Sequence, residues 1–307
     1  MRNFLCTALF VMLLGSFVSS LVLADNTGGD VKVSTTKIAD NLFYFSTSGV
    51  NRVGNVVALI GPDGTLLVDS QFDNVAALLM DAVKNAGGET PKFLINTHYH
   101  SDHSGGNAWF GRRGTLLIGH ARTFELLKSG ASIPASKTEL PPSPRVAWPM
   151  ITFSDEITLH LNGEVIQALS VQNAHTAGDV LVHFLKANVI HSGDILFFGA
   201  LPFIDVDHGG TLPGMIAAVD KVLAFSDSQT QIIPGHGPLV HKEDVVWMRG
   251  MLQQAYDILM EKRRAGKSLG QVLKENPLSD WAENFGHNDF LTARKWTELV
   301  YPSLPAK

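Results

Sequence analysis

A run of metal-binding side chains constrains this chain more than any other feature of its sequence. Three histidines and one aspartate stand in the spacing His-x-His-x-Asp-His directly after an apolar stretch that is typical of a buried strand: His98, His100, Asp102 and His103 follow Phe93–Ile95. Imidazole and carboxylate ligands together suit zinc and similar first-row metals without any thiolate. The alternative is a solvated histidine-rich loop, the usual false positive for a short motif.

The spacing also predicts how these side chains are presented. In an extended segment, alternate side chains share a face, so His98, His100 and Asp102 are expected to point the same way. A turn would bring His103 into the same pocket, and Gly105–Gly106 would supply the backbone freedom for that turn. Four such ligands crowd a single tetrahedral ion that must also hold water. We therefore predict two metals at this cluster.

Residues 1–24 are predicted to form a secretory signal. Arg2 is followed by an apolar run, and Val22–Ala24 precede Asp25, which is the pattern of a signal cleaved after Ala24. An uncleaved membrane anchor is the alternative, because the apolar character continues to Leu23. The expected mature chain is secreted or periplasmic, with no stable membrane association after cleavage.

Composition narrows the chemistry further. The only cysteine, Cys6, lies inside the predicted signal, so the expected mature chain has no disulfide and no thiolate metal ligand. Of the 307 residues, 45% are hydrophobic and 17% are charged, with a formal net charge of -5 and no basic run of note. This composition is typical of a soluble globular protein and argues against nucleic acid as a partner. We expect a small-molecule substrate instead.

Strand and helix patterns alternate along residues 25–240, which predicts a layered α/β domain. We expect strands at Val31–Ser34, Leu42–Phe45, Asn55–Ile60, Thr65–Asp69, Lys92–Asn96, Thr115–Ile118, Ile151–Phe153, Ile157–Leu161, Glu164–Leu169, Val180–Leu185, Val189–His191 and Gln231–Ile233. We expect helices at Asp73–Ala86, with Asp73 as the N-cap, Asn107–Phe110, Ala121–Lys128 and Leu212–Phe225. The proline-rich segment 129–149 is expected to be a long surface loop.

Beyond Val240 the pattern becomes helical, and residues 241–307 are treated as a C-terminal helical extension. Helices are expected at Glu243–Arg264, Ser268–Glu275 and Phe290–Val300. This extension carries no ligand cluster. Its expected roles are packing, bordering the pocket, or pairing with a second copy in a homo-oligomer.

Three further candidate ligands stand at or near the ends of later strands. His175 lies in a loop, Asp194 follows a short apolar strand, and His236 stands in Pro-Gly-His-Gly-Pro after another. Functional side chains are commonly placed at strand ends in layered α/β folds. We therefore expect these three residues to meet the first cluster.

The order and rough spacing of all seven candidates resemble the metallo-β-lactamase superfamily of metallohydrolases over about residues 31–240. The motifs that carry the resemblance are His-x-His-x-Asp-His at 98–103, His-Thr-Ala-Gly-Asp from His175, Ser-Gly-Asp ending at Asp194, and Pro-Gly-His-Gly-Pro around His236. The resemblance implies a four-layer αβ/βα sandwich, with two packed sheets, helices outside and a binuclear zinc site at one edge.

The same resemblance implies a role for each ligand. One zinc would be held by His98, His100 and His175, the other by Asp102, His103 and His236, and Asp194 would bridge both. A hydroxide bridging the two zinc ions would be the nucleophile at neutral pH. Asp102 would act in catalysis by orienting that hydroxide and passing its proton to the leaving group. Other first-row divalent metals fit the same ligand types.

Asp194 separates this chain from some members of the superfamily. True zinc β-lactamases usually have cysteine or serine in that region, often followed by a lysine that holds the drug's carboxylate, whereas Ile195–Phe198 follow Asp194 here. We therefore expect an exported binuclear zinc hydrolase acting on a small ester, lactone, thioester or amide. A periplasmic β-lactamase is the first alternative. A non-catalytic metal-binding module on the same fold is the second, although such a module would be expected to have lost ligands.

Five more residues are candidates by position. His208 and Phe203 lie in a loop soon after Asp194, and Arg52 lies in a polar loop, so all three are proposed to contact substrate. Their alternatives are ordinary core packing or exposure without a role. Asp179 and Asp69 are proposed to orient ligand histidines as carboxylate partners.

Overall fold

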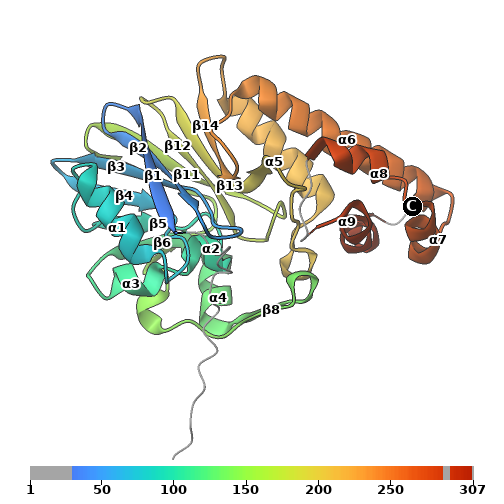
Figure 1. Ribbon diagram of the computed structural model, residues 1–307, viewed down its shortest axis with the longest axis horizontal. Coiled ribbons are helices and arrows are strands. Elements are labelled where there is room, and N and C mark those ends of the chain that lie inside the picture. The colour runs from blue at the N-terminus through green and yellow to red at the C-terminus, as the bar shows by residue number, and fades with distance from the viewer. Residues whose placement is uncertain (1–29, 286–290, 306–307) are drawn as a thin grey trace, which may run out of the picture.

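Two β-sheets lie face to face in the computed structural model, which describes residues 30–285 and 291–305 (Figure 1). The seven-stranded sheet has the order β1-β2-β3-β4-β5-β6-β9 and the five-stranded sheet the order β10-β11-β12-β13-β14. The strands of the first sheet are β1 (Lys32–Ala39), β2 (Leu42–Ser48), β3 (Val56–Gly61), β4 (Gly64–Val68), β5 (Phe93–Ile95), β6 (Leu116–His120) and β9 (Ile151–Phe153). Those of the second are β10 (Glu156–Leu161), β11 (Glu164–Val171), β12 (Asp179–Phe184), β13 (Val189–Phe197) and β14 (Gln231–His236).

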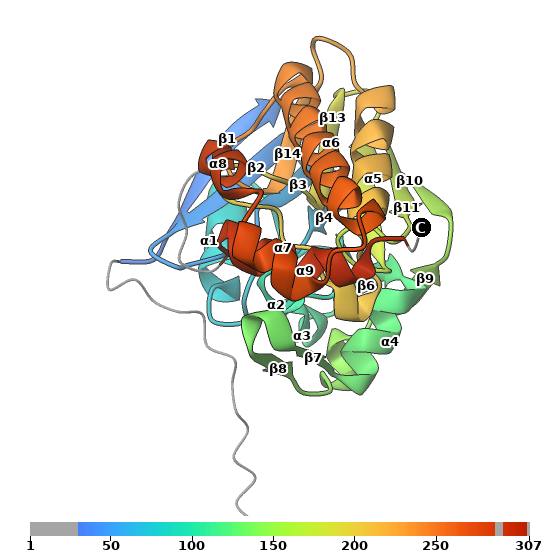
Figure 2. The ribbon, with the colours of Figure 1, turned by 90° about the vertical axis from the view of Figure 1, so that its right-hand side faces the viewer.

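Helices cover the outer face of each sheet. On the first sheet lie α1 (Ala76–Asn85), α3 (Asn107–Gly111) and α4 (Ala121–Ser129), while the short α2 (Ser101–Ser104) follows β5 at the sheet's edge. On the second lie α5 (Leu212–Phe225) and α6 (Lys242–Arg264), which run side by side (Figure 2). The chain continues through α7 (Leu269–Glu275), α8 (Ser279–Ala282) and α9 (Ala293–Val300). This arrangement confirms the expected four-layer αβ/βα sandwich with a helical C-terminal region.

Alternating side chains explain why each sheet is buried on both faces. On β3, Val57 and Leu59 join the cluster between the sheets, whereas Val56 and Ala58 join the cluster beneath α1. A third cluster fills the space between the second sheet and the outer helices, where Met215 of α5 is fully buried. The period-two pattern therefore places one strand in two hydrophobic cores.

Most expected strands and helices are present, with corrections at particular positions. Asp73 is not the N-cap of α1: the cap is Val75, and its side chain makes no capping hydrogen bond. The segment 129–149 is not an unstructured loop, because it contains the hairpin of β7 (Ala131–Ile133) and β8 (Thr138–Leu140). The prolines of this segment argue against strands there, but all of them lie outside β7 and β8.

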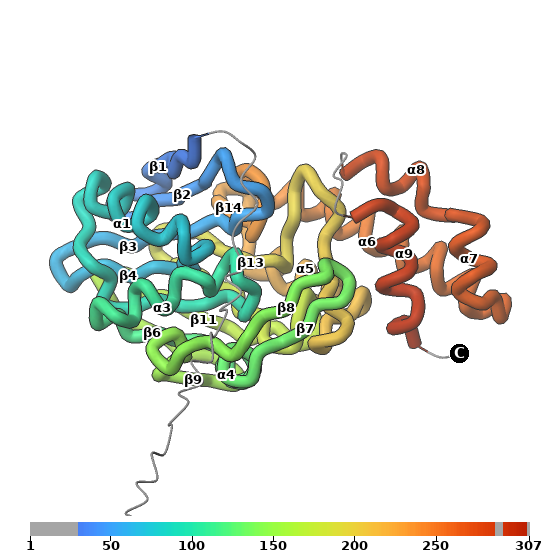
Figure 3. The backbone as a smooth tube through the Cα atoms, turned by 60° about the horizontal axis from the view of Figure 1, so that its bottom comes forward, coloured from blue at the N-terminus to red at the C-terminus, as the bar shows by residue number. Residues whose placement is uncertain are grey.

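The C-terminal helices gather at the end of the molecule away from β1–β4 (Figure 3). Their buried side chains, including Leu252 of α6 and Trp296 of α9, belong to the same hydrophobic cluster as Phe197 of β13. The predicted signal at 1–24 and the predicted helix start at Phe290 lie outside the described residues. Within the described ranges, no helix is long and apolar enough to cross a membrane.

Candidate metal centre

The cluster at 98–103 stands where the chain turns from β5 into α2. His100 is the N-cap of α2 in an extended conformation, and Asp102 and His103 lie within the helix. The expectation of one extended segment through Asp102 is therefore wrong. A helical turn, and not strand alternation, directs Asp102 and His103 away from the side of His98 and His100.

The glycines that follow serve a different purpose from the one predicted. Gly105 and Gly106 have ordinary negative φ angles of -59° and -75°. At Gly106, however, a Cβ atom would lie 2.3 Å from the backbone oxygen of Ser70. Glycine is needed here for close backbone approach, because any side chain would push α2 away from β4 and the residues after it.

The other three candidates come from the second sheet. Asp194 lies inside β13, which is longer than predicted and continues to Phe197, and His236 is the last residue of β14. β13 and β14 are parallel, with Phe197 opposite His236. His175 stands in the connection between β11 and β12. The carboxyl ends of β5, β13 and β14 thus meet at one edge of the sandwich.

Two groups of side chains result, and each could hold a metal ion. One consists of His98, His100, His175 and Asp194, the other of Asp102, His103, Asp194 and His236, and in each the ligand atoms lie within 4.8 Å of one another. In the first group, His100 Nδ1 lies 3.1 Å from His98 Nε2 and 2.9 Å from His175 Nε2. In the second, His236 Nε2 lies 3.1 Å from Asp102 Oδ2 and 3.4 Å from His103 Nε2.

Asp194 joins the two groups, one carboxylate oxygen to each. Its Oδ2 lies 3.4 Å from His175 Nε2 and 3.8 Å from His98 Nε2. Its Oδ1 lies 3.0 Å from His103 Nε2 and 3.5 Å from His236 Nε2. Two dications side by side need such an anion between them, and a carboxylate at this position provides it.

Hydrogen bonds on the far side of each ring set the tautomers in the first group. His175 Nδ1 donates to the carbonyl oxygen of Phe203 at 2.8 Å, and His100 Nε2 donates to Asp205 Oδ2 at 3.0 Å. Neither oxygen can donate, so each ring places its N–H on the outer nitrogen and leaves the inward-facing nitrogen as the one with a lone pair. Two lone pairs facing each other at 2.9 Å repel unless a cation lies between them.

The tautomer of His98 is set by a hydrogen bond with Thr97, whose own orientation is set by Asp69. The hydroxyl of Thr97 donates to Asp69 Oδ2 at 2.7 Å, so it can only accept at its contact with His98 Nδ1, 3.1 Å away. His98 Nε2 is then a third inward lone pair. Three imidazole lone pairs and a carboxylate oxygen are a donor set that zinc accepts, and the residues present therefore fit the metal.

The space around Asp194 supports the same conclusion. Asp194 is 5% exposed, and its Oδ1 is a buried atom that accepts no hydrogen bond from the described residues. A Cβ atom at Gly235 would lie 1.9 Å from this oxygen, and one at Gly54 would lie 2.5 Å from the ring of His103. Gly235 and Gly54 therefore lie so close to Asp194 and His103 that any larger side chain would clash with them.

Protons occupy the second group when no metal is bound. Burial opposes a charge on His236, but Asp194 and Asp102 outweigh it and raise the pKa of His236 to about 9. Burial likewise opposes a charge on His103, yet Asp194, Asp102 and Asp69 hold the pKa of His103 well above its usual value. A metal entering this group must therefore displace protons.

The first group behaves in the opposite way. Burial lowers the pKa of His175 to about 4, although Asp194 acts against this change. Burial and the neighbouring His103 also hold the pKa of His98 well below its usual value. These rings are neutral at pH 7 and have their lone pairs ready for a metal.

We expect the metal-free protein to lose stability as the pH rises from 6.5, the usual pKa of histidine, to about 9, the pKa of His236. The folded state binds more protons than the unfolded state in this window, so stabilisation that is complete below pH 6.5 disappears as the folded-state pKa is passed. The zinc-loaded protein has no such protons to lose. Thermal unfolding midpoints of chelator-treated and zinc-loaded samples measure the difference. Parallel pH profiles for the two samples would contradict the prediction.

The two carboxylates proposed as histidine partners behave differently. Asp69 is fully buried, and its Oδ2 lies 2.7 Å from His103 Nδ1, as a partner of a ligand must. Asp179 instead accepts hydrogen bonds from the backbone N–H and hydroxyl of Thr176, at 2.8 and 2.6 Å. The prediction that Asp179 directly holds a ligand histidine is therefore wrong. It shapes the turn just after His175.

Asp205 fills that role for His100 and was missed from the sequence. It is 1% exposed, and besides His100 it contacts the hydroxyl of Tyr99 at 2.5 Å and His208 Nδ1 at 2.9 Å. These donors outweigh the effect of burial and lower the pKa of Asp205, so it is ionised. Its separation from His100 along the chain left no local pattern to find it. Its neighbour His208 was the only signal.

Replacing Asp205 by asparagine is expected to weaken metal binding at the first group about 10- to 100-fold, the usual loss when an outer partner of a metal ligand is removed. The amide can present its N–H to His100 and so favour the wrong tautomer. Chelator competition measures the affinity. Asp207→Asn is the matched control, because Asp207 is exposed and two residues away. Equal affinities in the two variants would contradict the role of Asp205.

The three proposed substrate contacts differ in position. Phe203 is 8% exposed, and its ring centroid lies 5.9 Å from that of His100 and 5.7 Å from that of His175. It packs behind the ligands. The side chain of His208 is 15% exposed and is held by Asp205. Arg52 is exposed, with a positive φ of 53° in the turn between β2 and β3.

The segment 49–55 between β2 and β3, which carries Arg52, is anchored at its end. Gly54 N–H donates to the carbonyl oxygen of Asp102 at 3.3 Å, and Asn55 N–H donates to that of Gly235 at 2.8 Å. The loop therefore contacts both the α2 side and the β14 side of the second group.

Comparison with known proteins agrees with this geometry. The metallo-beta-lactamase superfamily profile matches residues 49–241. The chain is 26% identical over 227 residues to the metallo-beta-lactamase IND-1 of Chryseobacterium indologenes, covering 72% of this chain and 89% of that protein. It is 25% identical over 232 residues to the human acyl-coenzyme A thioesterase MBLAC2, covering 65% and 79% respectively. The crystal structure of the DIM-1 metallo-beta-lactamase superposes with a TM-score of 0.58 at 20% identity, covering 74% of this chain and all of that one.

The chain therefore belongs to the metallo-β-lactamase superfamily. Together with its two buried histidine and aspartate groups, this membership makes the protein a metal-dependent hydrolase with a donor set that suits zinc. The non-catalytic metal-binding module considered from the sequence is not supported, because every position of the two groups carries a histidine or an aspartate. The relatives do not support the expectation that the chain is not a β-lactamase proper, because they include β-lactamases and a thioesterase.

Proposed function

We propose that this chain is an exported two-zinc hydrolase that cleaves a small carboxylic acid derivative, namely an ester, lactone, thioester or amide. The observation that carries the proposal is Asp194, whose two oxygens reach ring nitrogens of both groups at 3.0 to 3.8 Å. We assign His98, His100 and His175 to one zinc and Asp102, His103 and His236 to the other. When bound, two zinc ions would polarise the substrate carbonyl and lower the pKa of water toward about 7.

The second group is where substrate and water arrive. In the second group the side chains of Asp102 and His236 are 16% and 17% exposed, although His103 is fully buried. In the first group the side chains of His98, His100 and His175 are 1%, 8% and 1% exposed. Asp102 is thus the carboxylate nearest the opening, and its pKa is held well below the usual value by His103 and His236 despite burial. An ionised carboxylate there can accept a proton from the attacking water and return it to the leaving group.

The residues after Asp194 favour a substrate without an obligatory carboxylate. Ile195 and Leu196 are fully buried, and Phe197 stacks on His236 with ring centroids 5.0 Å apart and an interplanar angle of 16°. No cation stands in this segment. The wall beside His236 is therefore apolar, which suits an acyl group better than a charged one.

β-Lactam hydrolysis is the second candidate, and the named relatives favour it. Besides IND-1, the chain is 22% identical over 212 residues to a type 2 metallo-beta-lactamase of Bacteroides fragilis. Opening a β-lactam is hydrolysis of an amide, so the same side chains can perform it. We propose export on the basis of the segment 1–24 alone.

A substrate panel with metal analysis tests both candidates. The mature chain would be assayed against β-lactams, lactones, esters, thioesters and phosphodiesters, with and without chelator, after its bound metal is counted. Two zinc ions per chain and chelator-sensitive turnover of an ester, lactone or thioester above any β-lactam are expected. Faster turnover of β-lactams would replace the first candidate by the second. A folded sample that does not bind metal, or turnover that chelator does not change, would refute both candidate functions.

A further inference from the structure

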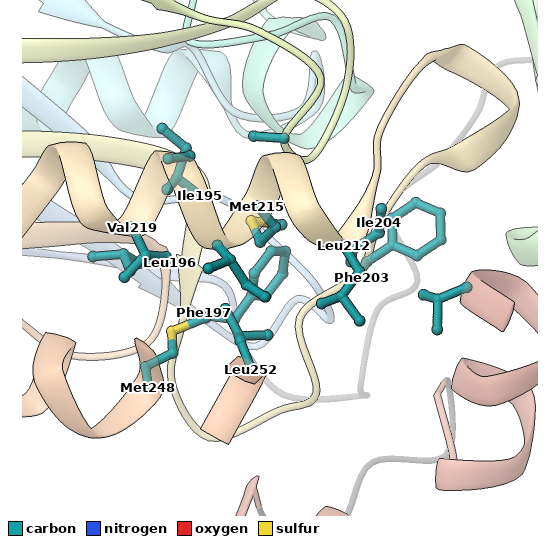
Figure 4. Close-up of a cluster of buried hydrophobic side chains, with 14 of the residues drawn as sticks. Ile195, Leu196, Phe197, Phe203, Ile204, Leu212, Met215, Val219, Met248 and Leu252 are labelled. Carbon is teal, nitrogen blue, oxygen red and sulfur yellow. The ribbon is translucent and has the colours of Figure 1, made fainter. Parts of the chain in front are cut away.

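The C-terminal helices lie beyond the part of the chain that the superfamily profile matches. The superfamily match ends at residue 241, one residue before α6 begins, and the DIM-1 chain is covered completely by 74% of this chain. Yet α6 to α9 do not form a separate core. Leu252, Trp281 and Trp296 share one buried cluster with Leu201, Phe203 and Ile204 of the loop after β13. Figure 4 shows Phe203 and Ile204 of that loop among the side chains of the cluster.

One hydrogen bond ties this loop to the last helix. The indole N–H of Trp296, on α9, donates to the carbonyl oxygen of Pro202 at 2.8 Å. Trp296 is fully buried, so its N–H has no water to turn to if this bond is lost. The bond therefore fixes the backbone of the loop at Pro202 relative to the C-terminal helices.

The next residues of the same loop hold two ligand histidines. The carbonyl oxygen of Phe203 accepts from His175 Nδ1 at 2.8 Å, and Asp205 Oδ2 accepts from His100 Nε2 at 3.0 Å. Asp205 N–H also donates to the carbonyl oxygen of His175 at 2.8 Å. The loop segment from Pro202 to Asp205 therefore sets the tautomer and orientation of the His100 and His175 rings.

We propose that Trp296 is a positioning residue for the first metal: the C-terminal helices hold the Pro202–Asp205 loop, and this loop holds His175 and His100. The proposal rests on the proposed metal assignment above. Buried hydrogen bonds connect Trp296 to Pro202, and the same loop to His175 and His100. The extension then serves the metal site directly and not only the stability of the fold.

The chain contains a matched control for this proposal. The indole N–H of Trp281 also donates to a backbone carbonyl oxygen at 2.8 Å, but its partner is Met251 in α6 and not the loop. Trp281 is 4% exposed, and its ring centroid lies 4.9 Å from that of Trp296. Trp296→Phe and Trp281→Phe therefore each remove one indole and one hydrogen bond from the same cluster, and only Trp296→Phe releases the loop.

The test compares metal binding in the full-length wild type and both variants. In the Co²⁺-loaded protein, the exchangeable ring N–H protons of His100 and His175 can be followed as shifted proton NMR lines, and chelator competition gives the zinc affinities. Trp296→Phe is expected to speed exchange of both lines and to weaken the first metal about tenfold. Trp281→Phe is expected to lower the unfolding temperature similarly while leaving both readouts near the wild type.

A wild-type measurement keeps the proposal testable if Trp296→Phe does not fold. Linkage requires that whatever stabilises the metal through the loop is itself stabilised by the metal. Filling the site should therefore slow hydrogen exchange at the Trp296 indole N–H more than at that of Trp281. Equal effects on the two indoles, or identical metal readouts in the two variants, would overturn the proposal. Absence of metal binding by the wild type would instead refute the proposed function.

Discussion

Asp194→Asn is expected to lower hydrolysis by at least about a thousandfold, equivalent to about 4 kcal/mol of transition-state stabilisation. Each oxygen of Asp194 faces a different group, at 3.0 Å from His103 Nε2 and 3.4 Å from His175 Nε2. The amide keeps the shape but removes the charge that two neighbouring dications require. It also presents N–H donors to one of them. The variant should therefore retain at most one zinc.

Metal counting and steady-state kinetics on the same sample measure this prediction. Asp220→Asn is a suitable control, because Asp220 lies on the surface of α5 and pairs with Arg249 at 2.8 Å, away from the site. That control should bind two zinc ions and keep wild-type turnover. If Asp194→Asn retained two zinc ions and more than about a tenth of the activity, the bridging role would be wrong.

Gly235→Ala is expected to damage the site through shape alone. The new Cβ would lie 1.9 Å from Asp194 Oδ1, which can move only by turning the shared carboxylate, and 2.7 Å from the carbonyl carbon of Gly193, which can move only by shifting β13. Overpacking of this kind costs about 1 to 3 kcal/mol, and the strain falls on the shared ligand. We expect a lower unfolding temperature. We also expect loss of the metal held by the second group, because His236 of that group is the next residue.

Gly250→Ala is the matched control for that substitution. Gly250 lies within α6, and a Cβ atom there would meet no atom within 4 Å. Alanine in a helix interior is favoured over glycine by about 1 kcal/mol, so this control should be equally or more stable than the wild type. Calorimetry and zinc counting on both variants decide the matter. A Gly235→Ala protein as stable and as metal-rich as Gly250→Ala would show that the close approach is unimportant.

The sequence alone predicted the ligand set that the structure brings together, because ligand chemistry is carried by residue type. His98, His100 and Asp102 were identifiable from spacing, and His175 and Asp194 from their positions in the strand pattern. The layered fold was predictable for a similar reason: a strand buried on both faces must show apolar side chains at successive positions. Neither inference needs knowledge of distant contacts.

Other features depend on contacts between segments that are far apart in the chain. Asp179 and Asp205 are both aspartates in loops, and only the fold decides that Asp205 meets His100 while Asp179 meets Thr176. The anchor at Trp296 is likewise separated from Pro202 by the whole of α5, β14 and α6. No local pattern encodes such pairs, because a hydrogen bond depends on position in space.

The cluster at 98–103 shows where this division falls. Its sequence alone predicted metal binding, because three imidazoles and a carboxylate at this spacing are typical metal ligands. The family resemblance implied that Asp102 and His103 serve one metal and His98 and His100 the other. The tertiary structure shows the cause: a helical turn at Ser101–Ser104 directs Asp102 and His103 to one group and leaves His98 and His100 in the other. The physical reason is that residue types fix what can bind, whereas backbone direction and burial fix which atoms converge.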